Sequence, residues 1–372
     1  MDQFKMNSRA GYPEIRSVKE GGQSFLKRFA ACLFSAVIFF AVPVPAGASA
    51  AEAPASQPAA VVSLGTLENL LDKYSLDVKA ARNALSQARE NYRDKKEWEG
   101  VTQADRDSME AAELTYRDSF RHLVLSAKRQ YLSYCLDSSL LSADEEASGD
   151  AQKQLAADSG LLSRGALSQT AYEESLENYQ KLEAAAKEKD ARVTQDRKAL
   201  RALLNLPENT PMDVLKPSDE EMDLSGIPTL NYGEDVLEMK RANASIQKDS
   251  MNFATVRKEI SSSDRDIENA QIQLTQTENR ETSAFRDLYD TLTISFPTYE
   301  QEKEQAARRE KDVEIESRRL TLGYTSEIKY RKAVSDLRTL ECQRETDRNT
   351  LYLALLEYQD MKGGISWSGS PT

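Results

Sequence analysis

Residues 163–185 read SRGALSQTAYEESLENYQKLEAA, and residues 321–343 read TLGYTSEIKYRKAVSDLRTLECQ. In both stretches a glycine (Gly165, Gly323) follows an apolar-periodic run, and a serine (Ser168, Ser326) stands three residues later. Glycine adopts the left-handed conformation that commonly ends a helix without steric cost. The serine can then cap the next helix. Because so short a connection holds its two helices antiparallel, each stretch predicts a helical hairpin.

The helices after the two glycines carry narrow apolar stripes. Apolar residues recur there at spacings of three, four and seven, which is typical of a coiled-coil seam; they are Tyr172, Leu176, Tyr179, Leu182, Ala186, Val193 and Leu200, then Tyr330, Val334, Leu337, Leu340, Leu351 and Tyr358. The polar stretch 344–347 interrupts the second stripe. We therefore expect the second hairpin to be locally weak there or to face a partner.

The two hairpins are copies of one unit. A constant shift of 158 residues superposes Tyr131 on Tyr289, Gly165 on Gly323 and Leu182 on Leu340, and no gap is needed over about 70 residues. Each copy reads as helix, break, long helix, glycine turn and helix. The expected helices cover 67–98, 107–162 and 168–204, then 232–260, 266–321 and 326–360.

The predicted fold class is all-α, with long antiparallel coiled-coil hairpins in two tandem repeats and little or no β structure. Repeat 1 covers residues 65–205 and repeat 2 covers 231–360. Between them, residues 206–230 contain four prolines and form a connector in which 212–217 (MDVLKP) is a possible short strand. Residues 361–372 form a tail, in which we expect GGISWSGSPT (363–372) to be frayed.

The amino terminus predicts export. Lys27 and Arg28 precede the apolar run FAACLFSAVIFFAVPV, and Ala48-Ser49-Ala50 supplies small residues for cleavage after position 50. Residues 1–50 are thus expected to be a secretory signal, with an uncleaved membrane anchor as the alternative. The Ala/Pro-rich residues 51–64 are expected to be a disordered linker. Without residues 1–50 the chain has 43 basic and 58 acidic residues, a net charge of −15, which argues against binding nucleic acid.

The glycine turns also carry a family resemblance. Both quoted stretches resemble the hairpin tips of the TolC family of outer-membrane efflux proteins, and 67–85 (LENLLDKYSLDVKAARNAL), 232–250 (YGEDVLEMKRANASIQKDS) and 201–211 (RALLNLPENTP) are similar to other parts of its repeat. The resemblance covers most of residues 65–360. It implies two long helices and two pairs of shorter helices per protomer, a trimer that encloses a tunnel, and partnership with a periplasmic adaptor (membrane fusion) protein and an inner-membrane transporter.

On this resemblance the adaptor would contact the hairpin tips. The expected contact residues surround the two glycines; they are Arg164, Gly165, Leu167, Ser168, Leu322, Gly323, Thr325 and Ser326.

The chain departs from the TolC pattern at one place in each repeat. Between its first and second helices the family inserts a β-hairpin that closes into a membrane barrel, whereas this chain has only EGVTQAD (99–105) and SSSDRDI (261–267). Neither stretch holds the strands of about ten residues that such a barrel requires. Two functions therefore stay open: a TolC-like helical component of an envelope efflux or export assembly, or a structural envelope coiled coil that has lost transport with the barrel. Either protein would lie in the periplasm or cell envelope, or be associated with the outer membrane.

The sequence offers no pattern for catalysis. His122 is the sole histidine, so a multi-histidine metal site cannot form, and a solvated or packed role is the more common one. Phosphate-binding glycine loops and nucleophile elbows are missing. We expect no enzyme activity, catalytic residue, metal or cofactor. Cys135 and Cys342 should be free or intermolecular thiols, because their positions relative to the turns are too far apart for a disulfide. Pro297 should kink or interrupt its helix.

Overall fold

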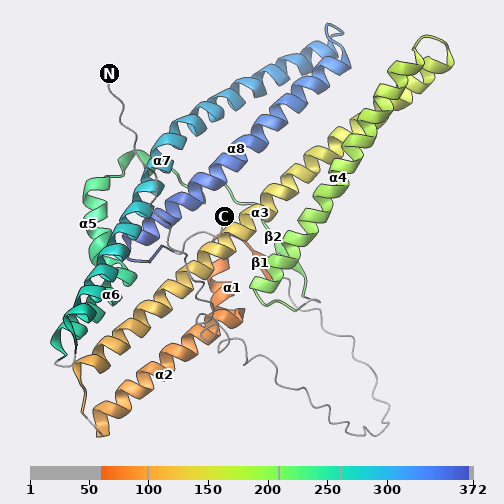
Figure 1. The fold of residues 1–372 in the computed structure, drawn as a ribbon. Helices are drawn as coiled ribbons and strands as arrows, with labels where there is room; N and C mark the ends of the chain where they lie inside the picture. Colours follow the sequence, from red (N-terminus) through yellow and green to blue (C-terminus); the bar gives the residue numbers. More distant parts are fainter. Residues whose placement is uncertain (1–59, 99, 208–209, 260–261, 368–372) are drawn as a thin grey trace, which may run out of the picture. The chain divides into compact units, whose positions relative to one another are not determined.

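The computed structural model describes residues 60–98, 100–207, 210–259 and 262–367. The predicted signal at 1–50 lies outside these residues. Eight α-helices account for most of the described chain, and the all-α prediction is confirmed. They are α1 Leu67–Tyr74, α2 Leu76–Trp98, α3 Gln103–Ser163, α4 Gln169–Leu203, α5 Tyr232–Ala242, α6 Ala244–Lys258, α7 Asp264–Thr321 and α8 Glu327–Lys362 (Figure 1).

Two long hairpins, α3–α4 and α7–α8, dominate the fold (Figure 1). The predicted 158-residue shift relates the ends of α3 and α7, at Ser163 and Thr321, and the starts of α4 and α8, at Gln169 and Glu327. The long helices also begin alike, because Thr102 and Ser263 each form a capping box with an aspartate three residues later. This reciprocal pairing satisfies backbone N–H groups that the first turn of a helix leaves free.

The first helix of each repeat is broken, which the sequence analysis did not predict. Ser75 separates α1 from α2, and Asn243 separates α5 from α6, and both residues have an extended backbone (ψ 131° and 124°). Asn243 explains its break, because its side-chain oxygen accepts hydrogen bonds from the N–H groups of Ser245 and Ile246. Such local bonding by asparagine favours a new helix start over continuation of the old one.

Two short strands form the β structure of the described residues. β1 (Ala60–Val62) pairs in parallel with β2 (Met212–Val214). The short strand expected in the connector is therefore confirmed. The expected disordered linker is wrong for its last residues, 60–64, because this pairing and the burial of Val62 and Leu64 hold them on the helices. A 3₁₀ turn, η1 (Ile227–Thr229), completes the connector.

The apolar core lies at the base of the hairpins, away from their glycine turns. Its centre in repeat 2 is the stacked pair Phe285 and Tyr358, with ring centroids 4.3 Å apart, and Tyr232 packs beside Phe285. The buried Tyr358 hydroxyl donates to Asp235 Oδ2 at 2.7 Å, and Lys362 also binds this carboxylate. Tyr358 is thus buried without leaving its hydroxyl unpaired. Pro297 lies inside α7, and the helix continues through it, so the expected interruption does not occur.

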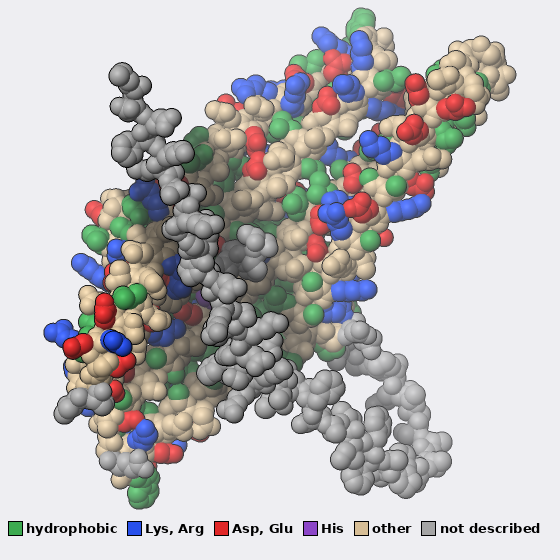
Figure 2. Space-filling view, in the orientation of Figure 1, with side chains coloured by type: hydrophobic (Ala, Val, Ile, Leu, Met, Phe, Trp, Pro, Cys, Tyr) green, Lys and Arg blue, Asp and Glu red, His purple; other side chains and the backbone are tan. Residues whose placement is uncertain are grey.

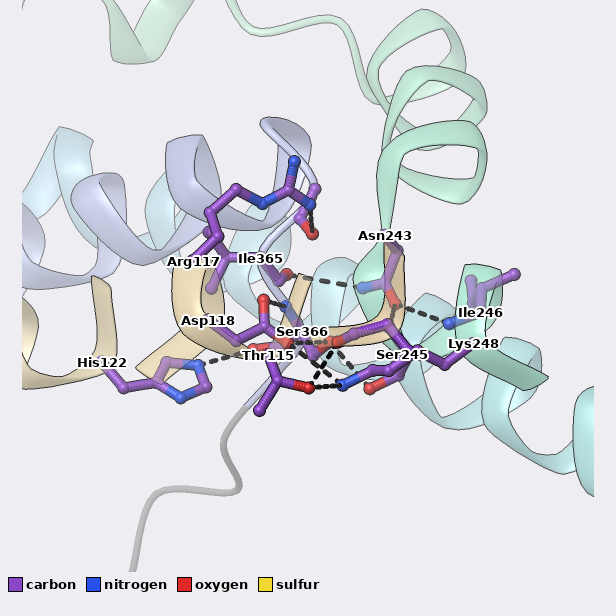
Figure 3. Close-up of polar contacts among 12 residues, drawn as sticks. Thr115, Arg117, Asp118, His122, Asn243, Ser245, Ile246, Lys248, Ile365 and Ser366 are labelled. Carbon is purple, nitrogen blue, oxygen red and sulfur yellow. Dashed lines mark hydrogen bonds and ion pairs between the residues drawn. The ribbon is translucent and has the colours of Figure 1, made fainter. Parts of the chain in front are cut away.

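The carboxyl-terminal segment ties the two repeats together. After α8 the chain turns back between α3 and the α5–α6 junction, and Ile365 and Ser366 are buried there (Figure 3). The Ser366 hydroxyl donates to Asp118 Oδ2 at 2.9 Å, and His122 Nε2 donates to the Ser366 carbonyl at 2.8 Å. The expectation of a frayed tail is therefore wrong for residues 363–367. The segment is ordered because it supplies donors and acceptors that α3, α6 and α7 would otherwise lack.

Arg117 and Glu281 extend this polar joint. Arg117 donates to the backbone carbonyls of Ala242 and Gly364, at 3.3 and 2.8 Å. Glu281, on α7, is fully buried and accepts from Asn243 Nδ2 at 3.0 Å and from the Trp367 N–H at 2.7 Å. Because a buried charge is tolerated only when it is paired and hydrogen-bonded, these contacts fix the segment in one position.

Gly364 allows the segment to approach so closely. Its φ of +95° lies in the left-handed region, and an added Cβ would lie 2.2 Å from the carbonyl oxygen of Ala242. We expect Gly364→Ala to lower the free energy of unfolding by at least about 2 kcal/mol.

Gly149→Ala is the matched control for this measurement by urea denaturation. Gly149 lies inside α3 with open space around it, so alanine there should raise stability by about 0.5–1 kcal/mol. Equal effects of the two substitutions would contradict the packing assigned to Gly364.

Candidate partner-binding surface at the hairpin ends

The two glycine turns have the same backbone geometry. Gly165 (φ +70°) donates its N–H to Leu162 O at 2.9 Å, and Ala166 donates to Leu161 O at 2.9 Å. Gly323 (φ +75°) donates to Leu320 O at 3.0 Å, and the next residue, Tyr324, donates to the carbonyl five residues earlier at 2.8 Å. This pair of bonds is the Schellman motif, which satisfies the last carbonyls of a helix and requires a left-handed residue.

Several of the expected contact residues serve the turns themselves. The hydroxyls of Ser168 and Ser326 accept from the N–H groups of Ala171 and Lys329 at the starts of α4 and α8. Thr325 is half-buried and hydrogen-bonds to Glu316, which holds the pKa of that glutamate below its ordinary value. Leu167 is half-buried, whereas the Arg164 and Leu322 side chains are exposed. The structure thus brings each group of four together at its own turn.

The two ends differ in chemistry. At the α7–α8 end three large apolar side chains face solvent: Leu322, Tyr324 and Ile328 are 68, 80 and 67% exposed. At the α3–α4 end Leu161 is the exposed large apolar residue. Figure 2 shows this difference, with hydrophobic atoms at the α7–α8 end and mostly other atoms at the α3–α4 end.

Tyr324 and Ile328 were not among the predicted contact residues. Tyr324 follows the glycine, at a position that in a Schellman motif commonly packs on the residue five positions earlier. That residue is Arg319 here and Leu161 in the first turn. The sequence therefore contained a signal that Tyr324 has no apolar partner within its own turn.

Ion pairs join the two hairpins along α3 and α8. Asp150 pairs with Arg331 at 2.8 Å, Glu146 with Arg338, and Arg121 with Asp360 at 2.5 Å. Residue numbers rise along α3 as they fall along α8, so the helices run antiparallel. The contact between the repeats is therefore largely electrostatic beyond the base, in contrast to the apolar core below.

The antiparallel register of α3 and α8 also explains why Cys135 and Cys342 form no disulfide with each other. Ser139 Oγ lies 3.4 Å from Glu345 Oε1, and Cys135 and Cys342 lie about one turn away from this contact in opposite directions. The two thiols are therefore about 10 Å apart along the helices, too far for a disulfide. Neither cysteine forms a disulfide within the described chain, in agreement with the prediction of free or intermolecular thiols. Burial raises the pKa of the Cys135 thiol to about 11 and also raises that of Cys342.

A carboxyl pair lies within the second hairpin, where the polar stretch 344–347 crosses the seam. Glu302 of α7 faces Asp347 of α8, and its buried Oε2 atom receives no hydrogen bond from any described residue. Burial and the neighbouring carboxylate raise the pKa of Glu302 to about 7. The expectation of a locally weak seam therefore has a physical basis at this pair.

Several proteins of known structure have a similar arrangement of helices. No protein-family model and no curated protein matches the sequence. Among solved structures, the CmeC outer membrane channel of Campylobacter jejuni superposes with a TM-score of 0.58 and 11% identity, covering 89% of this chain and 95% of that one. The outer membrane protein VceC of Vibrio cholerae gives 0.56 and 10%, covering 81% and 96%. A membrane protein of Pseudomonas aeruginosa gives 0.54 and 13%, covering 81% and 93%.

This is the fold of the TolC-type outer membrane channels. At such low identity the likeness concerns the fold. The resemblance inferred from the two glycine turns is confirmed in the TolC-like arrangement of two long helices and two sets of shorter ones. None of the helices in the described residues has the length and apolar character needed to cross a membrane. No cluster of three or more metal-binding side chains occurs in that part of the chain.

The Glu302–Asp347 pair predicts a pH dependence of stability. A glutamate whose pKa is raised on folding favours its protonated form in the folded state, so its stabilising effect is lost as the pH rises through about 7. Between about pH 5 and pH 8 the wild type should lose, relative to Glu302→Gln, on the order of 1 kcal/mol of unfolding free energy after solvent screening.

Urea unfolding at several pH values measures this difference. The exposed Glu304 of the same helix supplies the control, and Glu304→Gln should follow the wild-type pH profile. If Glu302→Gln follows it as well, the pair does not titrate as stated.

Proposed function

We propose that the chain is the helical component of an efflux or export assembly of the cell envelope, located in the periplasm or at the outer membrane. The likeness to outer membrane channels over 81–89% of the chain carries this proposal. The two named channels are described as an outer membrane channel and an outer membrane protein. For this chain we propose the role that the helical part has in such channels.

Self-association is the first part of the proposal. Beyond the base each hairpin is a two-helix coil: Leu200 is the buried residue of α4, and the buried residues of α8 begin at Arg348. Two helices alone can bury only a narrow stripe, so the half-buried positions farther out favour further packing against other copies. A trimer enclosing a tunnel is the assembly we propose.

Docking of an adaptor is the second part. The exposed Leu322, Tyr324 and Ile328 at the α7–α8 end are the kind of apolar anchors that dominate protein interfaces. An adaptor that presents its own helical hairpin would cover them and pack against the glycine turns, where the missing side chains allow close approach. An inner-membrane transporter would complete the assembly.

Light scattering coupled to size-exclusion chromatography tests the assembly. We expect a mass three times that of the chain, stable on dilution. A monomer would count against the tunnel and favour the structural coiled coil, which needs no closed ring.

Binding of a periplasmic adaptor from the same organism, measured by biolayer interferometry, tests the docking. Leu322→Ser with Tyr324→Ser should weaken binding at least about tenfold, because exposed anchors are lost without a change in the turn. The matched control is Leu237→Ser with Trp98→Ser, which removes two exposed apolar side chains elsewhere and should leave binding unchanged.

The glycines give a stronger version of this test. Valine at both Gly165 and Gly323 should abolish binding, since a β-branched residue is strained at positive φ. Unchanged adaptor binding in both double variants would refute docking through the tips, whatever the oligomeric state.

A further inference from the structure

A polar cavity of about 710 Å³ lies at the joint between the two repeats. Its walls come from α3, from the segment after β2 and from α8. This volume is within the range of about 300–1,000 Å³ that is common for small-molecule sites. The lining is polar and contains four cations, Lys216, Arg338, Arg344 and Arg348, against three carboxylates, Asp219, Glu341 and Glu345.

Two of these cations have unused hydrogen-bond donors. The Arg348 side chain is 9% exposed, and its Nε atom has no hydrogen-bond partner among the described residues. Arg344 is half-buried and forms no ion pair or hydrogen bond with any described residue. Residues four apart lie on the same face of a helix, so both guanidinium groups reach the cavity from adjacent turns of α8. Arg344 begins the polar stretch 344–347 that interrupts the apolar stripe of the second hairpin, and Arg348 directly follows that stretch.

Most of the other charges of the cavity are already paired; Glu341, whose side chain is exposed, forms no hydrogen bond or ion pair with a described residue. Lys216 Nζ binds Glu345 Oε2 and Ser139 Oγ, each at 2.9 Å, and Arg338 pairs with Glu146. Serine hydroxyls at positions 138, 139, 142 and 218 also line the walls. The cavity thus offers unused donors on Arg344 and Arg348, and the buried Nε of Arg348 has no acceptor among the described residues.

We propose that this cavity binds a small oxyanion, a phosphate or a carboxylate, held by Arg344 and Arg348. Guanidinium groups match the planar or tetrahedral oxygens of such anions and bind them with two parallel hydrogen bonds. A bound oxyanion would give the buried Nε of Arg348 the acceptor it lacks. The site involves neither hairpin end and is independent of the proposed docking.

Asp219 occupies part of the site from within the chain. Its carboxylate accepts from Arg348 Nη1, but its own side chain is 69% exposed. An exposed carboxylate on a connector gives up a partner at little cost, because water can solvate it. Asp219 therefore competes with the external anion for Arg348.

Isothermal titration calorimetry of the purified chain with inorganic phosphate, and separately with acetate, tests the proposal at constant ionic strength. We expect one saturable site per chain for at least one of the two anions, and the anion that binds identifies the class. Arg344→Gln should weaken this binding by about tenfold or more. Asp219→Asn, an exposed change that does not threaten folding, should tighten it.

Arg308→Gln is the control, because Arg308 is an exposed arginine of α7 that does not line the cavity. It should leave the affinity unchanged. Absence of saturable binding for both anions would overturn the proposal. So would equal weakening by Arg344→Gln and Arg308→Gln, or an Asp219→Asn variant that binds no more tightly than the wild type.

Discussion

Reversal of the chain at a left-handed residue is the constraint on which this structure depends. Four helices end in the same pair of backbone hydrogen bonds, with Gly165, Asn205, Gly323 and Gly364 at positive φ. After Gly165 and Gly323 the chain continues as a return helix, which lies antiparallel so that its apolar stripe meets that of its partner. After Asn205 the chain enters the connector, and after Gly364 it enters the carboxyl-terminal segment. Without these reversals the long helices would have no fixed register, and neither the ion pairs of α3 and α8 nor the core at the base could form.

The joint between the repeats is made by a different kind of interaction. At the base the carboxyl-terminal segment links α3, α6 and α7 through buried hydrogen bonds to Asp118, Asn243 and Glu281 (Figure 3). Farther out the hairpins meet through ion pairs such as Asp150–Arg331. Partly exposed ion pairs are weak and are screened by salt, whereas buried, fully bonded groups tolerate only one geometry. The base is thus the rigid part of the joint, and the outer hairpins are held together less firmly.

This division has consequences for function. Apolar anchors at the α7–α8 end and a two-helix coil with few buried residues suit a protein that completes its packing with other chains. The polar cavity lies lower, between the outer seam and the base, where α8 replaces the apolar stripe by Arg344 and Arg348. A chain that needed α8 only for packing would gain more from apolar residues at these positions, because unsatisfied buried donors cost free energy.

The hairpins, the duplication and the low strand content of the described residues were predictable from the sequence. These follow from local physics: glycine at positive φ, serine caps and apolar spacing act within a few residues of one another. Tertiary structure decided the breaks at Ser75 and Asn243, the strand at 60–62 and the ordered segment 363–367. These features depend on partners far away in the sequence, such as Met212 for Ala60 and Asp118 for Ser366, and no local pattern encodes such pairs. The cavity likewise arises only where α3, the connector and α8 meet. From the sequence alone, Arg344 was visible only as part of a polar interruption in a helical seam.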